Sequence, residues 1–190
     1  EKIFASKHLY SPTSSMNYFS IDYDFWYGPD YDNFTHDFHE IVAPSSDMGG
    51  IYLGNLEAAS EQHNIDKGKI GAVLTVVKLW EKVNMAASKL GSNNHKKIDM
   101  EDYGGYNIAE HFDDTYEWID EKRKNKLNVL IHCRYGVSRS TTITVAYLMK
   151  KTGRPLKEIY KDVQEKRKCI GPNEGFIEAL IKYEKQLVQN

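Results

Sequence analysis

A single nine-residue stretch carries the residue types and spacing best suited to chemistry. It reads His132-Cys133-Arg134-Tyr135-Gly136-Val137-Ser138-Arg139-Ser140. An apolar run at 129–131 precedes the stretch and predicts a short buried strand, and the largely apolar segment 141–149 after it predicts a buried helix. The stretch is therefore a loop at a helix N-terminus, where unpaired backbone N–H groups and the helix dipole both favour a bound anion.

Cys133 in such a loop is predicted to be a nucleophile, because the same N–H groups and dipole stabilise the reactive thiolate. Arg139 is predicted to hold two oxygens of a bound phosphoryl group with its planar guanidinium. Gly136 supplies the backbone freedom that a loop curling around a ligand needs. The other residues expected to line the phosphate are Arg134, Tyr135, Val137 and Ser138. The alternative interpretation is that Cys133 is only a small buried apolar residue at a strand end.

Composition limits the possible classes of protein. A chain of 190 residues with 41% hydrophobic and 27% charged residues is long enough for one domain with a sizeable core. The net charge of −2 gives no support for nucleic-acid binding. The two cysteines, Cys133 and Cys169, form no C-x-x-C pair, so we expect neither a disulfide framework nor a thiolate zinc site, and a reducing compartment such as the cytoplasm or nucleus. No apolar run is long enough to cross a membrane and no signal pattern opens the chain, so no membrane insertion is expected.

Residues 1–47 differ from the rest and are predicted to be an acidic, aromatic-rich N-terminal extension, with the catalytic domain at 48–190. This segment contains eight carboxylates and two lysines, a net charge of −6, which leaves a net charge of +4 on the rest of the chain. Such aromatic content is unusual for a disordered tail. Two interpretations stay open: an arm near the phosphate-binding face that modulates access, or a structural extension that covers an apolar patch. His36 and His39 have metal-like spacing, but they lack a third ligand, and no metal or other cofactor is expected.

The rest of the chain alternates predicted strands and helices, which favours an α/β fold with a central, mostly parallel, twisted sheet flanked by helices. Strands are expected near 49–54, at 70–77 and at 97–100, and helices at 57–63 and 79–90. A further helix has Ile108, Phe112, Thr115 and Ile119 on one face. After the loop helix, Gly153 is predicted to be a C-cap and Pro155 a first helical position of a helix reaching about residue 166, and 172–173 open a last helix.

These features resemble the cysteine-based protein phosphatases with the signature HC-x5-R-S, and the dual-specificity branch in particular. Segment 146–149 looks like that branch's helix, 51–55 its first core strand, and 167–176 its closing segment. The resemblance covers roughly residues 49–187 and implies a small, atypical member, without a preceding kinase-docking domain. The loop differs from that of many relatives at Arg134-Tyr135, where those relatives have smaller or less basic residues.

The resemblance assigns several further roles. It implies that Asp102, on a glycine-containing loop, is the general acid that protonates the leaving group and then the base that activates water. From the sequence alone, Asp99, Glu101, Asp113 and Asp114 remain alternative carboxylates. Ser140 is expected to donate its hydroxyl to the departing sulfur. His132 and Asn173 are expected to support the loop structurally, and Ser138 is interpreted as a structural loop residue. Cys169 is expected to be buried bulk.

The predicted activity is hydrolysis of phosphotyrosine and phosphoserine or phosphothreonine in a phosphorylated protein, through a phosphocysteine intermediate. One alternative is a phosphatase of the same superfamily that acts on phosphoinositides or RNA 5′-phosphates; the loop has no lysine, but Arg134 is basic. Another is a phospho-binding module without turnover. The presence of Cys133, Arg139 and Asp102 together favours the enzyme.

Overall fold

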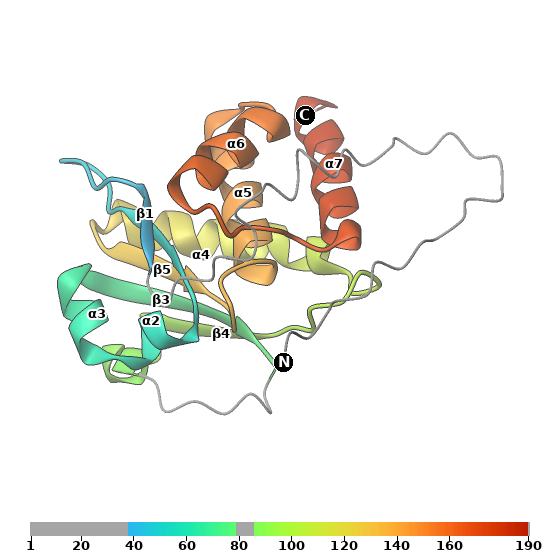
Figure 1. The fold of residues 1–190 in the computed structure, drawn as a ribbon. Helices are drawn as coiled ribbons and strands as arrows, with labels where there is room; N and C mark the ends of the chain where they lie inside the picture. Colours follow the sequence, from blue (N-terminus) through green and yellow to red (C-terminus); the bar gives the residue numbers. More distant parts are fainter. Residues whose placement is uncertain (1–37, 79–85, 190) are drawn as a thin grey trace, which may run out of the picture.

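A computed structural model describes residues 38–78 and 86–189, and its centre is a five-stranded sheet (Figure 1). The strand order is β1-β2-β5-β3-β4, with β1 antiparallel to β2 and all other neighbours parallel. The strands are β1 (His39–Val42), β2 (Ile51–Gly54), β3 (Ile70–Val77), β4 (His95–Asp99) and β5 (Asn128–His132). The predicted α/β class, with a mostly parallel central sheet, is confirmed.

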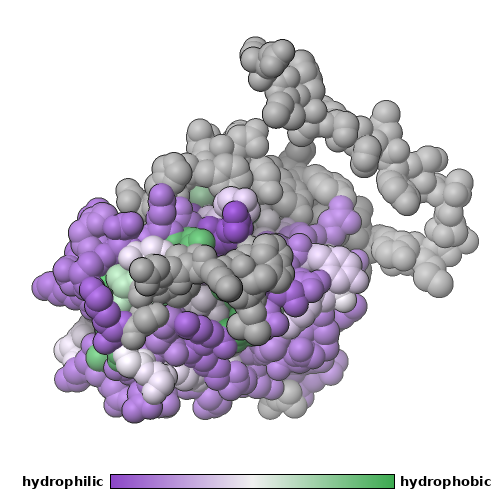
Figure 2. Space-filling model, turned by 90° about the horizontal axis from the view of Figure 1, so that it is seen from below, coloured by the Kyte–Doolittle hydropathy of each residue, from purple (hydrophilic) through white to green (hydrophobic). Residues whose placement is uncertain are grey.

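Helices cover both faces of the sheet, with α4 to α7 on one side and α2 and α3 on the other (Figure 1). The helices are α2 (Leu56–Ser60), α3 (Gln62–Lys67), α4 (Phe112–Lys124), α5 (Arg139–Thr152), α6 (Leu156–Lys166) and α7 (Glu174–Gln189), with the 3-10 helices η1 (Ala86–Leu90) and η2 (Ile108–His111). Seen from below in Figure 2, the described surface is mostly hydrophilic with small, separated hydrophobic spots.

Side-chain alternation along the strands creates two cores. On β3, Leu74 and Val76 point into the larger core under α4 to α7, whereas Val73 belongs to the smaller core under α2, α3 and η1. On β5, Ile131 joins the larger core and Leu130 the smaller one. Because strand side chains alternate with a period of two, a strand covered on both faces is apolar throughout, which is why the run 70–77 could be predicted as a strand from sequence.

Most predicted elements are confirmed, with shifts at their ends. The β-branched run is β3 as predicted, and the helix after the signature loop is α5, fully buried along most of its length. The amphipathic helix begins as η2 and continues as α4, and its four predicted face residues are all buried. Gly153 is the left-handed C-cap of α5 with φ of 67°, as predicted, whereas Pro155 is the N-cap of α6 and not its first helical residue.

Two predictions on helices need correction or fall outside the described chain. The single helix expected at 57–63 is two short helices, α2 and α3, because Glu61 takes an extended conformation with φ of −94° and ψ of 123° between them. Its N–H caps the carbonyl of Glu57, so α2 ends there. For the helix expected at 79–90, residues 79–85 lie outside the described residues and 86–90 form η1.

The segment 1–47, predicted to be a separate extension, contains β1 within its described part. Glu40 pairs with Tyr52 of β2, both along the ladder and through a 2.8 Å bond from Tyr52 Oη to the carboxylate. Residues 39–42 are therefore the antiparallel edge of the catalytic sheet. Residues 1–37, and with them the predicted role of the arm in access, lie outside the described residues.

Candidate active site

The candidate site lies where the parallel strands end. The signature loop follows β5, the central strand, and the loop 100–107 follows β4 at the same edge of the sheet. Parallel strands bring the segments after their carboxyl ends to one edge, which is where open α/β sheets bind ligands. This topology brings Asp102 into contact with Arg139 and Ser138 of the signature loop, although 31 positions separate it from Cys133 in sequence.

Cys133 lies at the floor of the loop, 1% exposed. Its Sγ accepts hydrogen bonds from the backbone N–H of Gly136 and from the hydroxyl of Ser140, both at 3.2 Å. Ser140 is in the first turn of α5, so the sulfur faces the positive end of a 14-residue helix. Two donors and a helix N-terminus stabilise a negative charge on sulfur, which is the state that a nucleophilic cysteine requires.

Arg139 is buried beside the cysteine and pairs with Asp102. Its Nε lies 3.4 Å from Asp102 Oδ2, and its Nη1 donates to the carbonyl of Met100 at 3.1 Å. The two side chains predicted to bind phosphate and to protonate the leaving group are thus in contact with each other. Asp102 is the carboxylate at the site, whereas Asp113 pairs with Lys150 and Asp114 with Lys96, away from it.

Asp102 is held by two further donors that tie three segments together. The Ser138 hydroxyl donates to Asp102 Oδ1 at 2.6 Å, and Asn173 Nδ2 donates to the same oxygen at 3.0 Å. Asn173 also accepts from the N–H of Phe176 and so caps α7. A Cβ on Gly175 would come within 1.9 Å of the carbonyl oxygen of Gly104, so the loop 100–107 packs directly on the first turn of α7. Asn173 therefore joins the loop 100–107 to the first turn of α7.

The back of the signature loop is held by a fully buried arginine on the closing segment. Arg167 Nε donates to the carbonyl of Gly136 at 2.8 Å, its Nη2 to that of Tyr135 at 3.2 Å, and its Nη1 to His39 Nδ1 at 2.9 Å. Gly136 has φ of 68°, and a Cβ there would lie 2.5 Å from the carbonyl oxygen of Gly54, so only glycine fits without strain.

His132 is buried behind the cysteine, and both of its ring nitrogens contact oxygen atoms. Its Nδ1 lies 3.2 Å from the carbonyl oxygen of Cys133 and its Nε2 lies 2.7 Å from the hydroxyl oxygen of Thr75. Burial lowers the pKa of His132 to about 3, despite the hydrogen bond to the Cys133 carbonyl, so the ring is neutral near pH 7. A neutral, buried ring in these contacts positions the loop and is not a general acid or base.

The outer rim of the loop is aromatic and basic. Tyr135 is 56% exposed, and the Arg134 guanidinium lies over its ring at 5.5 Å and donates to its hydroxyl. Tyr103, next to Asp102, is 59% exposed. Val137 is buried, and its carbonyl accepts from the N–H of Gly171. Substrate groups beyond the phosphate would thus meet Arg134 and the tyrosines, whereas Val137 joins the loop to the closing segment.

Comparison with known proteins places the chain in a family. A profile described as the dual specificity phosphatase catalytic domain matches residues 51–186. The chain belongs to the dual specificity phosphatase family. It is 35% identical over 138 residues to human dual specificity protein phosphatase 7 and 35% identical over 144 residues to dual specificity protein phosphatase 1 of Arabidopsis thaliana. These matches cover 72% and 76% of this chain, but 32% and 70% of the relatives, so the chain spans about a third of the human relative's length.

A structural comparison agrees with the family. The human tyrosine phosphatase-like serine/threonine/tyrosine-interacting protein superposes with a TM-score of 0.73 at 26% identity, over 81% of this chain and 99% of that one. The dual specificity phosphatase fold therefore spans nearly all of the described residues. Within those residues, no helix is long and apolar enough to cross a membrane, and no three His, Cys, Asp or Glu side chains gather as a metal site.

Two residues of this site were missed by sequence reasoning: Arg167 was noted only as part of a family segment, and Thr75 only as a strand residue. Ser138 was predicted to line the phosphate and to have a structural role in the loop, but its hydrogen bond to Asp102, the shorter of the two described for that carboxylate, was not predicted. A buried polar residue in a strand that ends at the catalytic edge, as Thr75 is, was the one signal that could have pointed to its role.

Proposed function

We propose that this chain hydrolyses phosphomonoesters of phosphorylated proteins, on tyrosine and on serine or threonine, through a phosphocysteine intermediate. The observation that supports the proposal most is the Cys133 sulfur with two hydrogen-bond donors at the N-terminus of α5, beside the Arg139–Asp102 pair. The charge of a phosphoryl group can be met by Arg139, the loop N–H groups and the helix dipole.

In the first step, the Cys133 thiolate attacks phosphorus, an S–P bond forms and the P–O bond to the substrate breaks. The leaving phenolate or alkoxide is strongly basic, so it needs a proton, which Asp102 supplies. Arg139 stabilises charge on the equatorial phosphoryl oxygens as it develops. The products of this step are the dephosphorylated substrate and phosphocysteine.

In the second step, water attacks phosphorus and the S–P bond breaks. Asp102, now ionised, takes the proton from water, and inorganic phosphate is released. The Ser140 hydroxyl stabilises the departing thiolate, because it already lies 3.2 Å from Sγ. Neither of these two reaction steps requires a cofactor.

The ion pair between Arg139 and Asp102 links substrate binding to acid catalysis. A bound phosphoryl group competes with Asp102 for the guanidinium, because both are anions that suit the same planar fork. Once Arg139 faces the phosphate, the Asp102 carboxylate is released from this ion pair and can turn towards the leaving group.

Turnover of a simple aryl phosphate by the wild type, Cys133→Ser and Cys169→Ser tests the activity. Cys169 is the matched control, since it is also a buried free cysteine. We expect Cys133→Ser to lose turnover but still bind a phosphopeptide, and Cys169→Ser to retain turnover. Activity of Cys133→Ser within about tenfold of wild type would exclude the thiolate mechanism.

A panel of phosphopeptides, phosphoinositides and RNA 5′-phosphates tests the substrate class. We expect the highest kcat/KM with phosphopeptides. A higher value with a phosphoinositide or an RNA 5′-phosphate would replace the protein substrate with that class, and binding without turnover of any of them would favour a phospho-binding module.

A further inference from the structure

Two exposed tyrosines belong to the two loops that form the candidate active site. Among the described residues, the large hydrophobic side chains that are exposed are Tyr103, Tyr135 and Val188. Tyr103 directly follows Asp102 on the acid loop, and Tyr135 is two residues after Cys133 on the signature loop. A single exposed apolar side chain is ordinary, but two on the loops of one site are typical of a ligand-binding surface.

The Tyr135 ring is held in place by its neighbour in the chain. The Arg134 guanidinium lies 5.5 Å from the ring centroid, and its Nε donates to the Tyr135 hydroxyl at 3.2 Å. Arg167 donates to the Tyr135 carbonyl at 3.2 Å, so the backbone that carries the ring is held as well. These contacts reduce the conformational freedom that the ring loses when a ligand packs on it, which lowers the cost of binding.

The Tyr103 ring lies against the backbone of its own loop. The N–H of Tyr106 donates to the Tyr103 carbonyl at 3.0 Å, which closes a turn through Gly104 and Gly105. A Cβ added at Gly105 would lie 2.8 Å from Cε2 of Tyr103 and closer still to its Cζ and hydroxyl oxygen. At Gly104, the atom nearest to an added Cβ is 3.4 Å away, in Gly175. Gly105 therefore provides the room that this position of the Tyr103 ring requires.

The chemistry of the leaving group brings part of the substrate to these tyrosines. The breaking P–O bond lies opposite the attacking sulfur of Cys133, so the leaving group points out of the signature loop. Asp102 has to lie beside the leaving oxygen to protonate it, so the group attached to that oxygen passes the residue next to Asp102, which is Tyr103. In phosphotyrosine this group is an aryl ring, whereas in phosphoserine and phosphothreonine it is one aliphatic carbon followed by backbone. Only phosphotyrosine presents a ring there.

We propose that Tyr103 and Tyr135 are specificity-determining residues that pack on the aryl ring of a phosphotyrosine, so that the site prefers phosphotyrosine to phosphoserine and phosphothreonine. This inference rests on the proposed phosphatase activity and names the substrate that the site favours. One aromatic contact corresponds to a change of about three- to tenfold in affinity. Two rings at the site therefore favour an aryl ligand by roughly ten- to a hundredfold.

The first measurement is binding, which needs no turnover. The protein is titrated in a calorimeter with two phosphonates that it cannot hydrolyse and that carry the same charge, a difluorobenzyl phosphonate and a difluoroalkyl phosphonate. Inorganic phosphate is the reference ligand, because it binds the signature loop but has no organic group. Tyr103→Leu and Tyr135→Leu remove one ring each and keep an apolar side chain, whereas Tyr103→Phe and Tyr135→Phe keep the ring.

We expect wild type and both phenylalanine variants to bind the aryl phosphonate about ten- to a hundredfold more tightly than the alkyl phosphonate. Each leucine variant should lower this ratio roughly three- to tenfold and leave the affinity for inorganic phosphate unchanged. A wild type without a preference for the aryl phosphonate, or a ratio that is unchanged when both tyrosines are leucine, would overturn the proposal. A parallel loss of phosphate affinity would also overturn it, because the tyrosines would then support the loop and not the ring.

Two glycine variants test the position of the Tyr103 ring without changing Tyr103 itself. Gly105→Ala has to displace the ring, because the new Cβ would overlap its outer end, so the aryl-to-alkyl ratio should fall as far as in Tyr103→Leu. Gly104→Ala is the matched control on the same turn, and it should keep the wild-type ratio, because its Cβ meets no atom closer than 3.4 Å. Equal ratios in the two glycine variants would refute the role of Tyr103.

Turnover then separates this inference from the proposed function. With phosphotyrosine or phosphothreonine at the same position of one peptide, each leucine variant should lower the ratio of the two kcat/KM values by the factor found in binding. A protein that prefers the aryl phosphonate but hydrolyses neither peptide would refute the proposed function alone. A protein that hydrolyses both peptides with the same ratio of kcat/KM values in wild type and in the leucine variants would refute the role of the tyrosines alone.

Discussion

Replacement of Arg167 by methionine is the perturbation whose size the structure defines best. The arginine is fully buried, and its guanidinium donates to the carbonyls of Gly136 and Tyr135 and to His39. Methionine keeps an apolar stem of similar length, so the main loss is the three donors and not the packing.

The magnitude follows from the two backbone acceptors left behind. The bond to the Gly136 carbonyl is buried, and a buried acceptor that loses its donor costs about 1–3 kcal/mol of unfolding free energy. The bond to the Tyr135 carbonyl is only partly buried and adds less, so the two together cost about 2–4 kcal/mol. At about 2–4 °C per kcal/mol for a chain of this size, Tm should fall by roughly 4–16 °C. The signature loop should also become less well held, so inorganic phosphate should inhibit more weakly.

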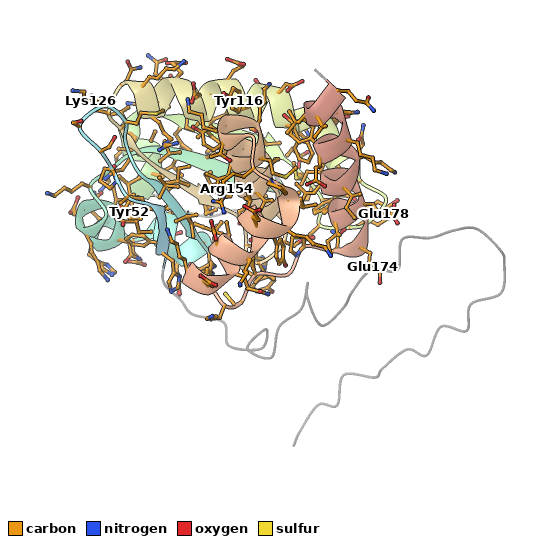
Figure 3. All side chains as sticks on the ribbon, turned by 90° about the horizontal axis from the view of Figure 1, so that it is seen from above. Tyr52, Tyr116, Lys126, Arg154, Glu174 and Glu178 are labelled. Atoms are coloured by element: carbon orange, nitrogen blue, oxygen red, sulfur yellow. The ribbon has the colours of Figure 1, made fainter. Side chains whose placement is uncertain are left out.

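The assay is thermal unfolding of Arg167→Met beside Arg154→Met, together with inhibition by inorganic phosphate. Arg154, labelled in Figure 3, pairs with Glu158 and Asp162 but is largely exposed, so its replacement should move Tm by no more than about 2 °C. If Arg167→Met behaves like Arg154→Met in both measurements, the loop does not depend on the buried guanidinium.

Three other predictions follow from the same contacts. Gly136→Ala should lower the free energy of unfolding in urea more than Gly153→Ala. Both glycines have φ near +68°, so alanine at either position costs about 1–2 kcal/mol, but only at Gly136 would the new Cβ also lie 2.5 Å from a backbone oxygen, that of Gly54 at the end of β2. Ser138→Ala removes a 2.6 Å hydrogen bond to the acid carboxylate and should lower kcat/KM for phosphotyrosine more than for an activated aryl ester; an equal loss would mean that the bond does not position the acid. Burial lowers the pKa of His132 to about 3 and that of His95 to about 4, so the unfolded chain binds more protons below about pH 6.5. As the pH is lowered from 6.5 towards 4, the unfolding free energy should fall by up to about 1.4 kcal/mol per pH unit for the fully buried His132 and by less for the half-buried His95, so the slope should be slightly smaller in His95→Gln.

Much of the local structure could be predicted from the sequence because its causes are local. The β-branched run 70–77 has to be a strand covered on both faces, and Gly153 ends α5 because glycine adopts positive φ readily. The order strand, Cys-containing loop, buried helix predicted both the nucleophile and its anion-binding surroundings. The short helices α2 and α3 could not be separated in this way, since their break at Glu61 carries no glycine or proline.

The packing of α4 against α5 shows what the periodicity of a single helix cannot predict. The position of Tyr116, labelled in Figure 3, on α4 follows from helical periodicity. Its ring centroid lies 5.4 Å from that of Tyr147, and the Lys150 ammonium lies over its ring, and both contacts depend on how α5 packs beside α4. Periodicity gives the face of a helix that is buried, and only packing gives the partner.

The sequence by itself determined the family and predicted the nucleophile and the phosphate-binding arginine, because these residues follow one another in a single loop whose spacing is set by the chain. Only the tertiary structure decided which of the five candidate acidic residues reaches that loop: among the described residues, the parallel order of β4, β3 and β5 brings Asp102 to Arg139. It likewise decided that Thr75 contacts His132, and that Arg167 holds the loop from behind. Such contacts join strands and segments through sheet register and helix packing, which no short stretch of sequence encodes.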